Sequence, residues 1–209
     1  MADERLFFVG DVQGCADELD DLLKAAELEP GRRLAFAGDL VNRGPKSRRV
    51  LERAVREGAL VVVGNHEDGL LQGKKGASFD RVRADLGDDL ARWLAWIAAL
   101  PTFMRWPDLI LVHAGIVPGK QPEQCSRGEL TRIRDYEGKP WFESWCGPET
   151  VVFGHWSVRG KVDLPLVKGL DTGCVYGGSL TGIRWPERTW TSVPARRSWF
   201  DPVEMKPLW

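Results

Sequence analysis

The sequence predicts an α/β fold in a single domain spanning residues 1–209, and two patterns carry this prediction. Short apolar, β-prone runs recur along the chain, and each stops at a glycine or a histidine. Such runs are typical of buried strands that end in tight turns. Between the first two runs, Leu19, Leu22 and Ala26 are spaced as one face of a helix. A chain of 209 residues, 43% of them hydrophobic, can bury one sizeable core.

The patterns alternate between strand and helix along the chain. We expect strands at 6–9, 34–37, 60–63, 109–112 and 151–153, and helices over 16–26, from Pro45 through Val55, and over most of 70–99. The runs 102–106 and 109–112, like 180–185 and 189–193, are separated by a proline beside an acidic residue, which predicts two hairpins. The basic and aromatic stretch from Ala195 is expected to pack on the surface.

Side chains of metal-binding types follow five of these runs. Each ending alone is an ordinary turn, since Gly and Asp are common turn residues. All three histidines of the chain lie at such endings, however. Because open α/β sheets bind ligands at the carboxyl ends of their strands, we expect the five endings to converge on a binuclear metal site. The side chains at these endings are Asp11, Gln13, Asp39, Asn65, His66, His113 and His155.

Charge and composition argue against several classes of protein. The formal net charge of −1 gives no electrostatic case for bulk nucleic-acid or membrane binding. The chain has no apolar run of membrane-spanning length, and its first residues lack the basic and apolar regions of a leader. The four cysteines show no zinc-type C-x-x-C spacing. We therefore expect a cytoplasmic protein without membrane contact.

Five motifs, in this order, resemble those of the calcineurin-like metallophosphoesterases, in their phosphoprotein phosphatase branch. They are Gly10-Asp11-x-Gln13-Gly14, Gly38-Asp39-x-Val41-Asn42-Arg43-Gly44, Gly64-Asn65-His66-Glu67, His113-Ala114-Gly115 and Gly154-His155. Within that branch, the first two motifs and the stretch 170–174 are similar to bacterial symmetrical diadenosine tetraphosphatases. The resemblance covers roughly residues 6–190. It implies a four-layer α-β-β-α sandwich with two mixed sheets and a binuclear metal site at the strand ends.

The resemblance implies two groups of metal ligands. Asp39 belongs to both groups, because a carboxylate can bridge two divalent ions and offset their charge. A hydroxide between the ions would then be the nucleophile that attacks phosphorus. The first ion would be held by Asp11, Gln13 and Asp39, and the second by Asp39, Asn65, His113 and His155.

The resemblance also implies roles around the metals. His66 would protonate the leaving oxygen, since the pKa of imidazole lies near working pH. Arg43 and Arg134 would hold the phosphoryl oxygens, because a planar guanidinium can bind two of them at once. Arg132 competes with Arg134 for the second position, and Tyr176 would lie near the substrate.

Two residues depart from the common family pattern. Gln13 stands where the family has histidine, and its neutral oxygen is a harder ligand than imidazole. We therefore predict Mn²⁺ as the cofactor, rather than iron or zinc, with Mg²⁺, Co²⁺ or Ni²⁺ as alternatives. Asn42 stands where the family has aspartate, so it cannot form an ion pair with His66. We expect His66 to lose its proton at lower pH for this reason.

The substrate is less well specified than the chemistry. The first hypothesis is a dinucleoside polyphosphate, with diadenosine tetraphosphate cleaved to two ADP. The alternatives are a phosphoprotein (Ser, Thr or Tyr) and an RNA 5′ end or cap, and a fourth is a metal-binding module without catalysis, against which His66 and Arg43 argue. Residues 70–99 are fewer than the helical insert expected of the tetraphosphatases. Within them, Lys74 and Lys75 lie either at the site mouth or in a solvated loop. The oligomeric state stays open.

Overall fold

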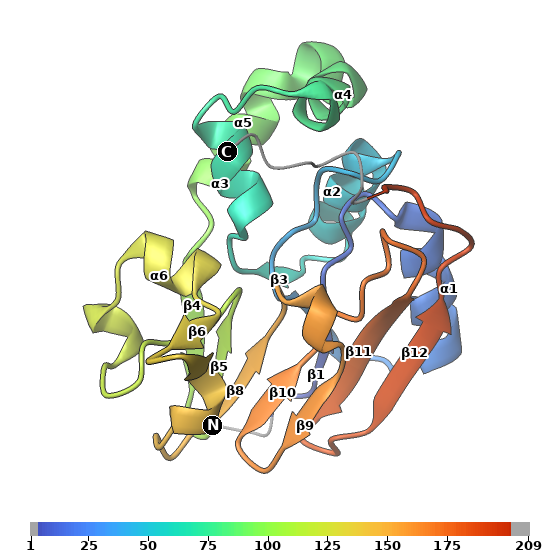
Figure 1. Ribbon diagram of the computed structural model, residues 1–209. Coiled ribbons are helices and arrows are strands. Elements are labelled where there is room, and N and C mark those ends of the chain that lie inside the picture. Colours follow the sequence, from blue (N-terminus) through green and yellow to red (C-terminus); the bar gives the residue numbers. More distant parts are fainter. Residues whose placement is uncertain (1–3, 202–209) are drawn as a thin grey trace.

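Two five-stranded mixed sheets pack face to face in this computed structural model, which describes residues 4–201 (Figure 1). The first has the order β12-β11-β1-β2-β3 and the second the order β4-β5-β8-β10-β9. The first sheet consists of β1 (Leu6–Val9), β2 (Arg33–Phe36), β3 (Leu60–Val61), β11 (Ser179–Trp185) and β12 (Trp190–Pro194). The second consists of β4 (Phe103–Trp106), β5 (Leu109–Val112), β8 (Thr150–Phe153), β9 (Val162–Leu164) and β10 (Val167–Gly169).

Parallel strands lie at the centre of both sheets. In the first, β1 pairs parallel with β2 and β2 with β3, while β11 and β12 join as antiparallel strands. In the second, β8 pairs parallel with β5 and with β10, and β4 and β9 are antiparallel edges. The central strands of both sheets therefore bring their carboxyl ends, and the loops that follow them, to one edge.

The apolar strand runs are continuous because both faces of each sheet are covered. In β1, Phe7 and Val9 belong to the core beneath the helices, whereas Leu6 and Phe8 belong to the core between the sheets. In β5, Leu109 and Leu111 face the space between the sheets, and the alternate residues face a third core on the outer side. Side chains thus alternate between two cores, as the two-residue period of a strand requires.

Helices form the outer layers. Against the first sheet pack α1 (Ala16–Ala26) and α2 (Ser47–Arg56), whereas α3 (Asn65–Leu71), α4 (Ala77–Leu86), η1 (Gly87–Asp89) and α5 (Leu90–Ala98) gather at the top of the molecule in Figure 1. The second sheet has a thinner cover, built from α6 (Arg127–Arg132), the small hairpin β6 (Asp135–Tyr136) and β7 (Lys139–Pro140), and η3 (Trp141–Ser144). The short helices η2 (Pro122–Gln124) and η4 (Ser157–Arg159) lie in loops. This is the expected sandwich of helices, two mixed sheets and an outer layer.

Most expected elements are confirmed, including the helix over 16–26 and both hairpins. The largest boundary differences are at α2, which begins at Ser47 rather than Pro45, and at β3, which ends at Val61 rather than Val63. The stretch from Ala195 packs on the surface as expected, with Trp199 and Phe200 partly buried against the core beneath the helices. None of the described helices is long and apolar enough to cross a membrane.

Candidate metal centre and active site

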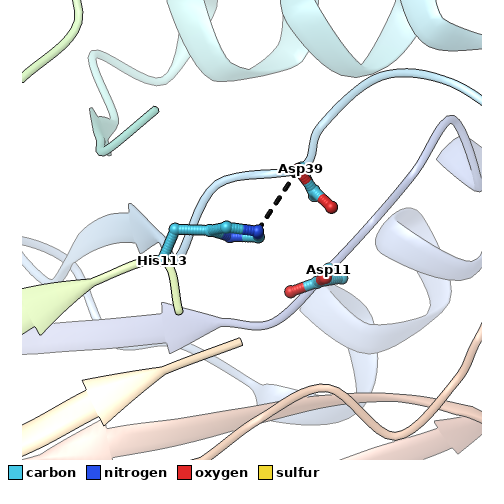
Figure 2. A group of neighbouring side chains, drawn as sticks. All are labelled: Asp11, Asp39 and His113. Atoms are coloured by element: carbon cyan, nitrogen blue, oxygen red, sulfur yellow. Dashed lines mark ion pairs between the residues drawn. The ribbon is translucent and has the colours of Figure 1, made fainter. Parts of the chain in front are cut away.

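The loops after five strands bring the expected metal ligands together. Asp11 follows β1, Asp39 follows β2 and His113 follows β5, and one ligand atom from each lies within 4.8 Å of the other two. Figure 2 shows the imidazole of His113 pointing toward the carboxylates of Asp11 and Asp39. Since each side chain comes from a different strand end, the site forms where the two sheets meet, as their carboxyl ends predict.

The two histidines expected to bind metal meet at the amide of Asn65. The Oδ1 atom of Asn65 lies 3.0 Å from His113 Nε2 and 2.7 Å from His155 Nδ1. His113 Nδ1 lies 2.7 Å from the carbonyl oxygen of Ala37, which can only accept, so this nitrogen carries the proton. His113 Nε2 is then a lone-pair donor that faces another acceptor, and a cation between them relieves the repulsion.

Gln13 offers a further oxygen to the same centre. Its Nε2 donates a hydrogen bond of 3.3 Å to Asp39 Oδ2. Its Oε1 is buried and has no hydrogen-bond partner among the described residues. A buried acceptor without a partner is costly unless a ligand satisfies it. Together with two carboxylates and neutral imidazoles, this free oxygen fits a divalent cation.

Burial is the main cause of the shifted pKa values of the expected metal ligands. It raises the pKa of Asp39 to about 6, and it raises that of Asp11 well above its usual value, with the charges of Asp171 and Asp39 adding to the effect. Burial also lowers the pKa of His113 and takes that of His155 to about 2, so both rings are neutral. Buried carboxylates that form no ion pair with a lysine or arginine of the described chain, beside imidazoles that stay neutral, are what a cation site requires.

The backbone of the site lies in the left-handed region at several non-glycine residues. The φ angles are 45° at Gln13, 48° at Asp39 and 69° at His155. Such conformations cost energy and persist where the surrounding structure determines them. The carboxylates are also closely packed, because a Cβ at Gly154 would lie 2.0 Å from Asp11 Oδ1, and one at Gly64 would lie 2.2 Å from Asp39 Oδ1. Glycine at these two positions leaves room for the carboxylates.

Glu67 holds the loop that carries Asp39, a role that the sequence analysis missed. Its Oε1 accepts from the backbone N–H groups of Leu40 and Val41, at 2.8 and 3.1 Å. Its Oε2 accepts from those of Asp39 and Gly64, at 2.9 and 3.0 Å. Glu67 lies in the first turn of α3, three residues after Gly64 as in a capping box. The capping-box spacing could have been recognised from the sequence. The hydrogen bonds from residues 39–41 to Glu67 could not, because they join distant parts of the chain.

His66 lies beside the carboxylate expected to bridge the metals. Its Nε2 is 3.7 Å from Asp39 Oδ2, and its backbone N–H donates to Asp39 Oδ1 at 2.9 Å. Burial, and then the charge of Arg43, lower its pKa well below the usual value. His66 Nδ1 and Asn42 Oδ1 are both buried without hydrogen-bond partners in the described chain. The two residues line one cavity, and the expected effect of a neutral Asn42 on the His66 proton stays a prediction.

A cavity of about 240 Å³ contains most of the predicted site. Arg43 and Arg134 both reach it, whereas Arg132 instead donates to Asp68 Oδ2 at 2.9 Å. This placement favours Arg134 over Arg132 for the second phosphate position. The guanidinium carbon of Arg43 lies 5.3 Å from the ring centre of Tyr176, which gives that ring a position beside the expected clamp. The predicted residues that line the cavity are Gln13, Asp39, Arg43, Asn65, His66, Arg134, His155 and Tyr176.

Comparison with known proteins agrees with this geometry. Residues 4–206 match the calcineurin-like phosphoesterase family, and the chain belongs to it. The expected class, a metal-dependent phosphohydrolase, is thereby confirmed. Proteins of this family use divalent metals, in agreement with the Asp11, Asp39 and His113 group.

Within this family, the chain is similar to proteins named as tetraphosphatases. The chain is 31% identical to a symmetrical bis(5'-nucleosyl)-tetraphosphatase of Janthinobacterium sp. (strain Marseille), over 90% of this chain and 95% of the relative. It is 32% identical to one of Vibrio cholerae, over 90% and 98%. A crystal structure provisionally named a diadenosine tetraphosphatase is 35% identical, with a TM-score of 0.85 over 93% of this chain and 95% of the other.

The length of one alignment confirms that this chain is shorter than a named relative. The match to the Janthinobacterium protein runs over 262 aligned positions, more than the 209 residues of this chain. That relative therefore carries segments that have no counterpart here. The similar solved structure is matched along nearly all of both chains, so its core is built from elements that this chain also has.

Proposed function

We propose that this protein hydrolyses dinucleoside polyphosphates, cleaving diadenosine tetraphosphate to two ADP with the help of two divalent metal ions. One observation carries the proposal: the donors of Asp11, Asp39 and His113 meet within 4.8 Å, in a site whose cavity also contains His66, Arg43 and Arg134. The names of the relatives support the choice of substrate. The proposal includes the cytoplasmic location expected from the sequence, which imaging of a tagged chain would test.

The chain's own residues divide the work around the metals. Asp11, Gln13 and Asp39 would hold one ion, and the second would use Asp39 with Asn65, His113 and His155. When bound, the ions supply Lewis-acid stabilisation and lower the pKa of water. Gln13 Oε1, which has no partner among the described residues, supports a hard ion such as Mn²⁺ at the first position.

Arg43 and Arg134 would hold the phosphoryl oxygens, and His66 would deliver a proton to the leaving oxygen. Neither arginine has an acidic partner in the described chain, so both remain available to an anion. Asn42 offers no charge to keep a proton on His66. Because the lowered pKa of His66 leaves it seldom protonated, the site suits a leaving group that is itself a stable anion, such as a nucleoside diphosphate, better than the alkoxide of a serine. This supports the anhydride substrate.

Product analysis with Mn²⁺ tests the proposal. Diadenosine tetraphosphate and phosphoserine or phosphotyrosine peptides are offered side by side, with His66→Asn as the control. We expect ADP alone from the dinucleotide, no peptide turnover, and a loss of about 10² to 10⁴-fold in kcat for His66→Asn. Faster turnover of the peptide, or of an RNA 5′ end offered in the same way, would overturn the choice of substrate. Full activity with tightly bound iron or zinc would overturn the choice of metal.

A further inference from the structure

A second cavity of about 380 Å³ opens beside the metal centre. It shares Arg43, Asn65 and His66 with the first cavity, so His66 lies at the junction of the two. The other walls come from Asn42, from residues 74–79 at the start of α4, and from Phe200. A volume between about 300 and 1,000 Å³ is typical of small-molecule sites.

The charges of this cavity have a single sign. Among the described residues, its lining includes Lys74, Lys75 and Arg43 but no acidic residue, whereas the first cavity contains Asp39 and Asp171. Neither lysine side chain has an ion pair or hydrogen bond within residues 4–201, although most basic residues of α2 pair with acids. Unpaired cations on one wall, without a balancing acid, favour an anionic ligand.

The ten-residue helix α4 adds to this wall. It begins at Ala77, and its N-cap Gly76 offers no side chain to the first-turn N–H groups, which lie at the cavity with the positive end of the helix dipole. Two further polar atoms in the lining lack hydrogen-bond partners within residues 4–201. These are His66 Nδ1 and Asn42 Oδ1, whose side chains are at least nine-tenths buried. They are an independent sign that the cavity is built for a polar ligand.

Helix α4 is hydrogen-bonded both to the loop that carries Arg43 and to the loop that joins α3 to α4. Arg81 of α4 donates a hydrogen bond of 3.4 Å to the carbonyl of Arg43, and Arg83 donates one of 2.5 Å to the carbonyl of Lys74. The backbone of Lys74 is therefore anchored, while the ammonium groups of both lysines have no partner among residues 4–201. Phe79 and Phe200 supply apolar surface beside them.

We propose that this second cavity is the subsite for the leaving group, and that Lys74 and Lys75 bind the phosphates which that group carries away. The inference rests on the proposed function, because a leaving group departs on the side from which His66 protonates it. It deepens that function by assigning specificity: the enzyme selects phosphoanhydrides whose leaving group is a nucleoside phosphate over simple phosphomonoesters.

The experiment compares two substrates in one set of proteins. Diadenosine tetraphosphate and p-nitrophenyl phosphate are hydrolysed by the full chain, by the Lys74→Ala/Lys75→Ala double variant and by Lys74→Arg/Lys75→Arg. Lys24→Ala, on the exposed side of α1, is the matched control. We expect the ratio of kcat/KM for the dinucleotide to that for the aryl phosphate to fall about tenfold or more in the alanine variant. In the arginine variant and in Lys24→Ala, this ratio of kcat/KM values should stay close to that of the unaltered chain.

Two further readouts separate this proposal from the proposed function. ADP, tested as an inhibitor of aryl phosphate hydrolysis, should bind about tenfold more weakly to the alanine variant. The KM for the dinucleotide should also respond less to added salt in that variant. Dinucleotide cleavage and ADP inhibition that are unchanged in the alanine variant would overturn the subsite and leave the function standing. A protein that ignores the dinucleotide, yet loses ADP inhibition with the lysines, would overturn the substrate and leave the subsite standing.

Discussion

The two sheets contribute chemically different halves of the candidate metal centre. The loops after β1, β2 and β3 carry the oxygen donors, and the loops after β5 and β8 carry the two imidazoles. Hydrogen bonds join the halves: His113 contacts the carbonyl of Ala37 at 2.7 Å, and the His155 N–H donates to Asp11 Oδ1 at 3.0 Å. The donor types are local to each loop, but the site exists only because the sheets pack together.

Replacing one ligand from each half should separate their roles, with the largest effects on activity. Asp39→Asn removes the carboxylate expected to serve both ions, so we predict the loss of both and a fall in kcat of about 10³-fold or more. His155→Asn should lose only the second ion. Metal content of the purified variants, measured beside kcat, checks this difference. Equal metal loss in the two variants would show that Asp39 is not shared.

Adding a methyl group next to each carboxylate tests the close packing. At Gly154 a Cβ meets mainly the Asp11 side chain, 2.0 Å from Oδ1, whereas at Gly64 it also lies 2.4 Å from the backbone N of Asp39. We predict that Gly154→Ala weakens metal binding about 10- to 100-fold, as changes around ligands do. Gly64→Ala should in addition lower the free energy of unfolding by about 1–3 kcal/mol.

Metal titration and thermal denaturation of the two glycine variants make the comparison. Gly58→Ala, whose added Cβ meets nothing within 4 Å, controls for the methyl group itself, although its φ of 56° adds some backbone strain. Unchanged metal affinity in Gly154→Ala would contradict the packing argument.

The oxygen-bearing half depends on Glu67 in a way that the imidazole half does not. In Glu67→Gln an amide NH₂ replaces one of the two oxygens and faces backbone N–H groups that have lost their acceptor. We predict a loss of about 2 kcal/mol in the free energy of unfolding. Glu52→Gln, which changes a half-exposed pair with Arg48, should cost less than about 1 kcal/mol. Denaturant unfolding of both variants tests this, and equal losses would remove Glu67 from its positioning role.

The smallest predicted effect concerns pH. Burial and the charge of Arg43 lower the pKa of His66, and neutral Asn42 does nothing to offset them. In Asn42→Asp a nearby carboxylate would favour the imidazolium, raise the pKa of His66 and keep its proton to higher pH. The alkaline limb of the kcat profile should therefore move upward by about one pH unit. Asn42→Ser adds no charge and should leave the limb in place. If the alkaline limb does not move in Asn42→Asp, the side chain at position 42 does not control the proton on His66.

The lysines show where prediction from sequence reached its limit. A short loop with two lysines is a solvated surface in most proteins, and nothing in its spacing distinguishes this one. The cavity that this loop lines is completed by residues far away in the sequence, which include Asn42, Arg43 and Phe200. Glu67 was underestimated for the same reason, because its partners lie 26 to 28 residues earlier in the chain. Contacts of this kind depend on packing rather than on pattern.

By itself, the sequence determined the chemistry and the order of the elements. The apolar runs, the helix spacing and the donor that follows each strand are local properties, set by strand and helix periods and by turn residues. The tertiary structure alone decided which donors meet and which arginine reaches the first cavity. It also decided that the described lining of the second cavity contains basic residues and no acidic ones. The physical reason is that strand-end loops from two sheets converge only when the core between the sheets, with Phe8, Leu111 and Val152 inside it, has formed.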